Sequence, residues 1–246
     1  MRALRTRKNR EASGRFLAEG IRVVEALVDS GLRTRWVLTS SSLTDSRRGE
    51  ALMAEVTRRG IPVRTVADEL FASFAATEKP QGVIAVAEIP ESSRRPFEAP
   101  PSRAVVLVLD AVQDPGNFGT LVRSAEALGA VGIVSLAGTV DPWNPKAVRA
   151  AAGSSFHVPI LQERWHAASS MLREAGYAIV GASVDGLPAS ELRERRVALV
   201  VGNEGAGLSN EVRDSLDHSI GVPLRGRAES LNVAAAAAIL LYELTR

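Results

Sequence analysis

The C-terminal part of the chain contains three short stretches that decide its fold: VVGNEGAGLS at 200–209, VPL at 222–224 and SLNV at 230–233. The apolar runs Val197–Val201 and Ser219–Val222 predict short buried strands, and each ends in a loop rich in Gly or Pro. Backbone N–H groups of a glycine loop can lie against a flat or anionic ligand because no Cβ intervenes. Glu204, Ser230 and Asn232 place a carboxylate, a hydroxyl and an amide beside these loops. We therefore predict a ligand site built from backbone groups and three polar side chains.

The region that leads to these loops predicts an α/β domain over residues 104–246. Residues 104–109 are apolar throughout, as expected for a parallel strand buried on both faces. Strands and helices then alternate, which favours a parallel sheet flanked by helices. We also expect a short strand at 155–160 and a helix at 162–175. Ligands of such sheets bind beyond the carboxyl ends of the strands, where the polar loops are expected.

Residues 1–88 predict a separate, smaller α/β unit. A helix is expected over 19–30, because its apolar residues recur at helical spacing and Gly31 follows it. Short strands and a second helix follow up to residue 88. Residues 89–103 contain four prolines and show no periodicity, so we interpret them as a linker between two domains.

Composition excludes several classes of protein. The 246 residues include no cysteine, so disulfides and thiolate metal sites are ruled out. The three histidines are scattered without metal-ligand spacing, and we expect no metal. No apolar run approaches the roughly 20 residues of a membrane span, and the basic start of the chain lacks an apolar signal segment. We therefore expect a cytoplasmic protein that does not associate with membranes.

Basic residues crowd the start of the chain, although the net charge is only +2. Of 30 basic residues, three are lysines and 27 are arginines, and seven basic residues lie within the first 22 positions. A basic arm of this kind commonly contacts phosphates, but a solvated tail has the same composition. Charge alone leaves both interpretations open.

The loop after residue 109 does not carry a common nucleotide-binding or hydrolase motif. Gly116 and Gly119 do not form the G-x-G-x-x-G fingerprint, and no acidic ribose clamp follows at the required distance. The chain has no P-loop and no G-x-S-x-G elbow. Asn117 is placed to cap a helix, and Arg123 follows nearly two turns later, so both can face the strand ends. Taken alone, these two residues also fit a plain helix cap and a surface arginine.

Three motifs stand out together: DAVQDPGNFGTLVRSAEALGA (110–130), VGNEGAGLS (201–209) and VPLRGRAESLNVAAAAAILLYE (222–243). With further support from NPKAVRAAAGSSFHVPI (144–160), they resemble the SpoU (TrmH-like) family of RNA ribose 2′-O-methyltransferases of the SPOUT superfamily. The first 88 residues, with GRFLAEG (14–20) and EKPQGV (78–83), are similar to the substrate-binding domain of members that modify ribosomal RNA. The segment before GRFLAEG is short compared with the family's pattern.

The resemblance implies a fold, a cofactor and a set of site residues. The domain at 104–246 would be a parallel α/β sheet with a C-terminal trefoil knot, an exception to the rule that chains are unknotted. S-adenosylmethionine would bind in the knot, and two subunits would pair there as a homodimer. The cofactor positions would be Ser183, Gly202, Asn203, Gly205, Val222, Leu224 and Leu231. The catalytic positions would be Asn117, Arg123, Glu204, Ser230 and Asn232.

The implied reaction is methyl transfer to a ribose hydroxyl of RNA, ribosomal RNA being favoured over transfer RNA by the N-terminal unit. A 2′-hydroxyl is a poor nucleophile and needs a base or a strong polarising contact. The family proposal makes Arg123 the base, but a guanidinium stays protonated in proteins. Arg123 can instead orient a phosphate and polarise the hydroxyl. Two alternatives remain: a tRNA ribose methyltransferase, and a non-catalytic RNA-binding or assembly factor that retains the knot.

Overall fold

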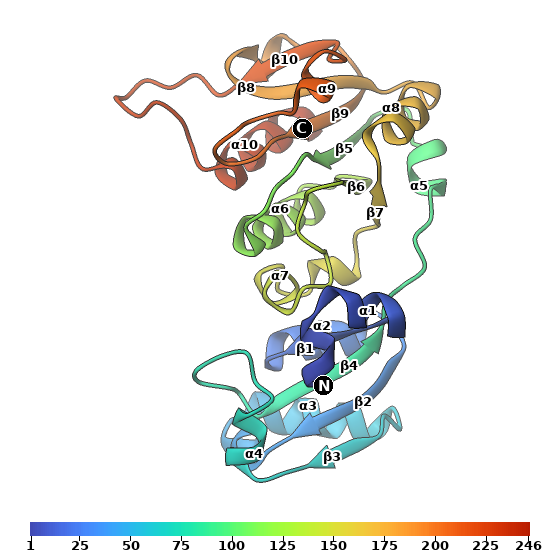
Figure 1. Ribbon diagram of the computed structural model, residues 1–246, viewed down its shortest axis with the longest axis vertical. Helices are drawn as coiled ribbons and strands as arrows, with labels where there is room; N and C mark the ends of the chain where they lie inside the picture. Colours follow the sequence, from blue (N-terminus) through green and yellow to red (C-terminus); the bar gives the residue numbers. More distant parts are fainter. The chain divides into compact units, whose positions relative to one another are not determined.

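A computed structural model describes residues 1–246, which form two compact units (Figure 1). The first unit contains Met1–Glu91 and Asp141–His157, and the second contains Ser92–Val140 and Val158–Arg246. No helix is long and apolar enough to cross a membrane. The sequence-based boundaries assign residues 141–157 to the C-terminal domain, whereas the structure packs them with the N-terminal residues.

The first unit is built on a four-stranded mixed sheet with the order β1-β4-β2-β3. β4 pairs antiparallel with both β1 and β2, and β3 runs parallel to β2. The strands are β1 Arg15–Glu19, β2 Thr34–Thr39, β3 Val63–Thr65 and β4 Val83–Glu88. The helices are η1 Arg2–Arg5, α1 Arg7–Ser13, α2 Ile21–Asp29, η2 Ser41–Asp45, α3 Arg47–Arg58, α4 Asp68–Ala72, α7 Pro145–Ala150 and η3 Ser154–Phe156.

The segment Asp141–His157 contributes to the core of the first unit. The ring of Phe16 lies 4.7 Å from that of Trp143 and 5.7 Å from that of Phe156, measured between centroids. The guanidinium of Arg10, which is only 2% exposed, donates through Nε to Asp141 at 2.7 Å. A buried charge of this kind is stable only when it is paired and hydrogen-bonded, so Asp141 is a structural partner of α1. Residues 141–157 are therefore part of this unit's core.

The second unit is a six-stranded sheet with the order β10-β8-β9-β5-β6-β7, in which every pairing is parallel. The strands are β5 Ala104–Leu109, β6 Gly132–Leu136, β7 Ile160–Glu163, β8 Ala178–Pro188, β9 Arg196–Val201 and β10 His218–Gly221. The helices are α5 Arg95–Glu98, α6 Pro115–Ala127, α8 Trp165–Glu174, η4 Ala189–Glu191, α9 Asn210–Arg213 and α10 Val233–Thr245. The expected parallel α/β fold is confirmed.

Helices cover both faces of this sheet, which explains the unbroken apolar run of β5. All six residues of β5 are buried. α8 packs on β8 and contacts α5, while α10 packs on α6, β5 and β9. Figure 1 shows α6 and α10 on one side of the sheet and α8 and α5 on the other. Alternate β5 residues therefore meet different helices.

Local signals set the helix boundaries next to the cavity described below. The Asp114 side chain caps α6 by accepting the N–H of Asn117 at 2.8 Å, and Pro115 occupies the first turn. The Asn232 side chain caps α10 by accepting the N–H groups of Ala234 and Ala235. The alanine run that follows has the highest helix propensity, so α10 is well specified by sequence.

Two local expectations differ from the structure. The strand expected at 155–160 is wrong, because Ser154–Phe156 form a 3-10 turn and the strand begins at Ile160. β1 was not expected, since RFLAE is too short to show alternation and is buried at four of its five positions. Its antiparallel pairing with β4, from Ile84 to Glu88, fixes it as a strand.

Candidate functional site

A cavity of about 770 Å³ lies at the carboxyl ends of β8, β9 and β10 in the second unit. Its wall is formed by the loop after β9, an excursion within β8, and the segment that leads into α10. The excursion is visible in the register, because Ser219 pairs with Gly181 whereas Ile220 pairs with Leu187. The volume lies within the range of roughly 300–1,000 Å³ that is usual for small-molecule and cofactor sites.

A chain of three polar side chains joins the three sequence motifs at this cavity. The Asn232 amide donates to Oδ1 of Asn117 at 3.0 Å, and the Asn117 amide donates to Oε1 of Glu204 at 3.0 Å. Asn117 belongs to α6, Glu204 to the loop after β9, and Asn232 to the start of α10. One asparagine in the middle thus fixes the relative positions of elements that are 87 and 115 residues apart in the chain.

The loop after β9 is held in shape by its own side chain and by the end of β5. Oδ1 of Asn203 accepts the N–H groups of Gly205 and Ala206, and its amide donates to the carbonyl of Ala111 at 2.9 Å. Asp110, only 5% exposed, accepts the N–H of Ser209 at 2.7 Å. The loop backbone is therefore preorganised before any ligand binds.

Two glycines are required by close backbone approach at the cavity. A Cβ on Gly202 would lie 2.3 Å from the carbonyl carbon of Gly207, and one on Gly221 would lie 2.4 Å from the carbonyl oxygen of Ser183. Side-chain carbons do not approach backbone atoms this closely, so only glycine fits these positions. Both glycines line the cavity.

The electrostatics of the cavity centre on Glu204. Partial burial by itself raises the pKa of this carboxyl, but hydrogen bonds from Asn117 and from nearby backbone groups outweigh it and lower the pKa. Glu204 is therefore an ionised acceptor at neutral pH, which suits a role in holding the motif loops together.

Most residues expected at the site line this cavity. They are Ser183, Gly202, Asn203, Val222, Leu224 and Leu231 from the cofactor set, and Glu204, Ser230 and Asn232 from the catalytic set. Gly205 is in the same loop but outside the lining. Asn117 also lies outside it and reaches the cavity through Glu204 and Asn232. Arg123 is exposed on α6, makes no side-chain hydrogen bond or ion pair, and does not line the cavity.

Sequence reasoning missed several groups of this site. Arg213 of α9 lines the cavity and donates to the carbonyl of Leu208. Leu208, Leu216 and Leu240 give the cavity an apolar wall. The apolar residues carry no signal of a site because buried leucines are common in any core. Arg213 is at the end of α9, the helix that follows the glycine loop, and could have been noted from its position.

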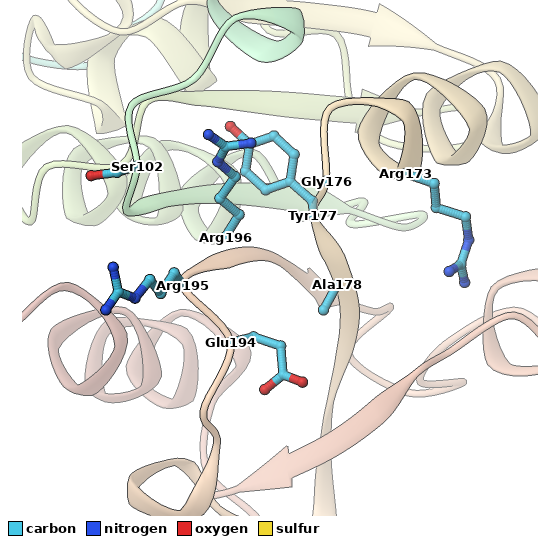
Figure 2. Close-up of a pocket in the computed structure, with 8 residues that line it drawn as sticks. All are labelled: Ser102, Arg173, Gly176, Tyr177, Ala178, Glu194, Arg195 and Arg196. Carbon is cyan, nitrogen blue, oxygen red and sulfur yellow. The ribbon is translucent and has the colours of Figure 1, made fainter.

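A second, smaller cavity of about 370 Å³ opens at the amino-terminal ends of β8 and β9 (Figure 2). Figure 2 shows the side chains of Arg173, Glu194 and Arg195 pointing in different directions around it. Arg173 is paired with Asp217, and Glu194 with His218. None of the motif residues contributes to this cavity. No group of three or more His, Cys, Asp or Glu side chains is arranged to hold a metal ion.

Two family models match the chain. One is described as the SpoU rRNA Methylase family and matches residues 104–242. The chain belongs to the SpoU rRNA methylase family. The other is described as an MRM3-like substrate binding domain and matches residues 1–85. The family assignment made from the three motifs is confirmed.

Individual SpoU relatives match almost the whole chain. The 23S rRNA (guanosine(2553)-2′-O)-methyltransferase RlmP of Bacillus subtilis is 37% identical over 98% of this chain and 92% of its own length. The 23S rRNA (uridine(2479)-2′-O)-methyltransferase of Streptomyces viridochromogenes is 32% identical over 99% of this chain and 86% of its own. The crystal structure of the SpoU methyltransferase AviRb from Streptomyces viridochromogenes, in complex with AdoMet, superposes with a TM-score of 0.84 at 30% identity, covering 99% of this chain and 94% of that one.

Proposed function

We propose that the chain is an S-adenosylmethionine-dependent methyltransferase that modifies a ribose 2′-hydroxyl in ribosomal RNA of the large subunit. The proposal rests on the hydrogen-bonded chain from Asn232 through Asn117 to Glu204 beside a cofactor-sized cavity. Full-length relatives named as 23S rRNA 2′-O-methyltransferases support the substrate class.

The lining of the cavity fits S-adenosylmethionine. Gly202 and Gly221 allow segments of the protein's own backbone to pack closely at the cavity wall, and Leu224, Leu231 and Leu240 offer apolar surface to a flat adenine ring. Backbone groups at Gly202, Val222 and Leu231 would hold the adenosine and methionine parts, with Ser183, Asn203 and Leu224 around them, whereas Gly205 is in the same loop but outside the lining. When bound, the cofactor supplies an electrophilic methyl group on a sulfonium.

The protein's share of the reaction is positioning and desolvation. The rate of a bimolecular displacement increases most when the two reactants are held in line in a site from which water is excluded. Asn232 and Asn117 would orient the ribose, and ionised Glu204 would keep the three motif loops in place. Ser230 would pass the proton of the 2′-hydroxyl to water. Arg123 would bind the phosphate of the target nucleotide and polarise the hydroxyl, since a guanidinium is a strong, permanently charged donor.

We further propose a homodimer, formed through the C-terminal region, with this region folded as a trefoil knot. Support for the dimer comes from apolar side chains that remain exposed on α10 and β8, namely Ile239, Tyr242, Val184 and Leu187. Apolar surface of this kind commonly marks an interface. Sedimentation at micromolar concentration should give twice the monomer mass of 26.1 kDa; a monomer would contradict the dimer. Residues 1–88 would bind the RNA, residues 89–103 would link the domains, and the protein would work in the cytoplasm.

The experiment that tests the proposed function is transfer of labelled methyl from S-adenosylmethionine to total rRNA and tRNA, followed by digestion to nucleosides. Label in a 2′-O-methylated nucleoside of 23S rRNA is the expected result. Label in tRNA would identify the substrate as transfer RNA instead. If naked RNA takes no label although the protein binds the cofactor, the transfer assay is repeated with ribosomal particles as the substrate. No label and no cofactor binding would refute the enzyme.

A further inference from the structure

A buried carboxylate in the first unit has no role in the site described above. Glu19, at the end of β1, is only 5% exposed, and acidic side chains are seldom buried unless they are well paired. Its two oxygens accept the N–H of Ala76 at 2.7 Å, the N–H of Thr77 at 3.2 Å and the Thr77 hydroxyl at 2.6 Å. All three donors come from one loop, which connects α4 and β4. Glu19 is thus dedicated to fixing this loop.

The same loop is fixed at two further points. The Arg5 guanidinium donates to the carbonyls of Phe74 and Ala75, at the start of the loop. At its end, Oε1 of Gln81 accepts the N–H of Ile21 at 2.9 Å. Contacts from η1, β1 and α2 therefore hold both ends of a segment that forms no regular structure itself.

Between these anchors the loop presents two charged side chains to solvent. Glu78 and Lys79 are exposed and make no ion pair or side-chain hydrogen bond. Figure 1 shows the loop between α4 and β4 projecting from the sheet of its unit. Ordering a loop costs backbone conformational entropy, which the anchors offset. A loop held in this way on a rigid sheet is a means of presenting its tip to a ligand.

We propose that the Ala76–Gln81 loop contacts the RNA substrate through Glu78 and Lys79, and that Glu19 is the positioning residue for this contact. The proposal rests on the proposed function, which makes RNA the substrate. A carboxylate accepts from the N–H groups of bases, and an ammonium donates to base or phosphate oxygens. Because the two charges cancel, the loop has little general attraction for the backbone. It is suited to the base edges of an unpaired nucleotide, where specific RNA recognition is concentrated.

A matched set of threonine variants tests the positioning role in the full-length enzyme. Thr77→Val removes only the hydroxyl that donates to Glu19, and Thr77→Ser keeps this hydroxyl. Thr57→Val makes the same change on α3, where the hydroxyl bonds its own helix at Met53. We expect Thr77→Val and Glu19→Gln to raise KM for RNA about tenfold, with kcat and KM for S-adenosylmethionine unchanged. Thr77→Ser and Thr57→Val should match the wild type. Equal changes of kcat in all four variants, or an unchanged KM for RNA, would overturn the proposal.

Lysine footprinting tests the contact itself. The chain has only three lysines, Lys8, Lys79 and Lys146, all exposed, so an amine-reactive label gives a map that is simple to assign. We expect bound RNA to slow labelling of Lys79 at least fivefold in the wild type and much less in Thr77→Val. Full labelling of Lys79 in the RNA complex would overturn the proposal. Footprinting measures RNA binding and does not require methyl transfer. If RNA protects Lys79 but the protein transfers no methyl group, the proposed function is refuted and the RNA contact stands.

Discussion

Gly202→Ala should weaken cofactor binding without unfolding the protein. The added Cβ would lie 2.3 Å from the carbonyl carbon of Gly207, and 2.4 and 2.5 Å from Gly207 O and Leu208 N. Ordinary contact begins near 3.4 Å, so the loop must retreat by the difference between 3.4 and 2.3, about 1.1 Å. Overpacking of this kind costs about 1–3 kcal/mol, and a factor of ten in affinity corresponds to about 1.4 kcal/mol. We expect binding of S-adenosylmethionine to weaken about 10- to 100-fold.

The same loop supplies the control for this prediction. A Cβ on Gly205 would meet only Oδ1 of Asn203, at 3.7 Å, so Gly205→Ala should bind the cofactor like the wild type. Isothermal titration calorimetry with S-adenosylmethionine compares the three proteins, and thermal unfolding shows whether each is folded. Wild-type affinity in Gly202→Ala, or an equal loss in Gly205→Ala, would refute the argument from backbone approach.

Three further predictions follow from particular contacts. Asn117→Asp should impair turnover more than Asn117→Ala, because the aspartate replaces the donor to Glu204 by a second carboxylate and thereby raises the pKa of Glu204. Equal kcat/KM in the two variants would contradict a functional role of this contact. The hydroxyl of Tyr177 is buried without a protein partner, and burial raises its pKa to about 12. Because the phenol of the unfolded chain ionises near pH 10, the free energy of unfolding should fall as pH rises from about 10 to about 12. Tyr177→Phe should remove this loss of stability at alkaline pH and leave stability at pH 7 unchanged. If the wild type and Tyr177→Phe show the same pH profile of thermal unfolding, Tyr177 is not the cause of the loss. A fragment of residues 1–91 should fail to unfold cooperatively, because it lacks Trp143, Val148 and Phe156 of its core, and a sharp thermal transition in this fragment would contradict the assignment of residues 141–157 to the first unit.

The parallel sheet and most of the site could be predicted from the sequence because their signals are local. The apolar run 104–109 and the glycine loop at 202–207 each indicate their structure within about ten residues. Glu204 and Asn232 were expected at the site from their motifs, and the structure places both on the cavity. Their connection through Asn117 could not be predicted, since a helix cap and a bridging amide look alike in a sequence.

Other features depend on contacts between distant residues and left no local signal. Arg10 looked like part of a free basic arm, yet it is buried against Asp141, which lies 131 residues later. Arg2 and Arg5 are likewise engaged at the end of α4, Arg2 over the ring of Phe74 and Arg5 on backbone carbonyls. Three of the seven basic residues at the start of the chain, Arg2, Arg5 and Arg10, therefore contact other parts of the protein. Pairings of this kind are decided by tertiary packing, which charge counts do not encode.

The role of Arg123 in methyl transfer is the point on which the proposed mechanism depends most directly. The measurement is single-turnover transfer of labelled methyl from S-adenosylmethionine to 23S rRNA by the wild type, Arg123→Ala and Arg123→Lys, alongside calorimetric binding of the cofactor. We predict that Arg123→Ala loses at least about 10³-fold in rate, that Arg123→Lys recovers only part of it because an ammonium lacks the planar fork, and that all three bind the cofactor equally. Wild-type transfer by Arg123→Ala, or a parallel loss of cofactor binding, would contradict the assignment of Arg123 to the ribose and its phosphate.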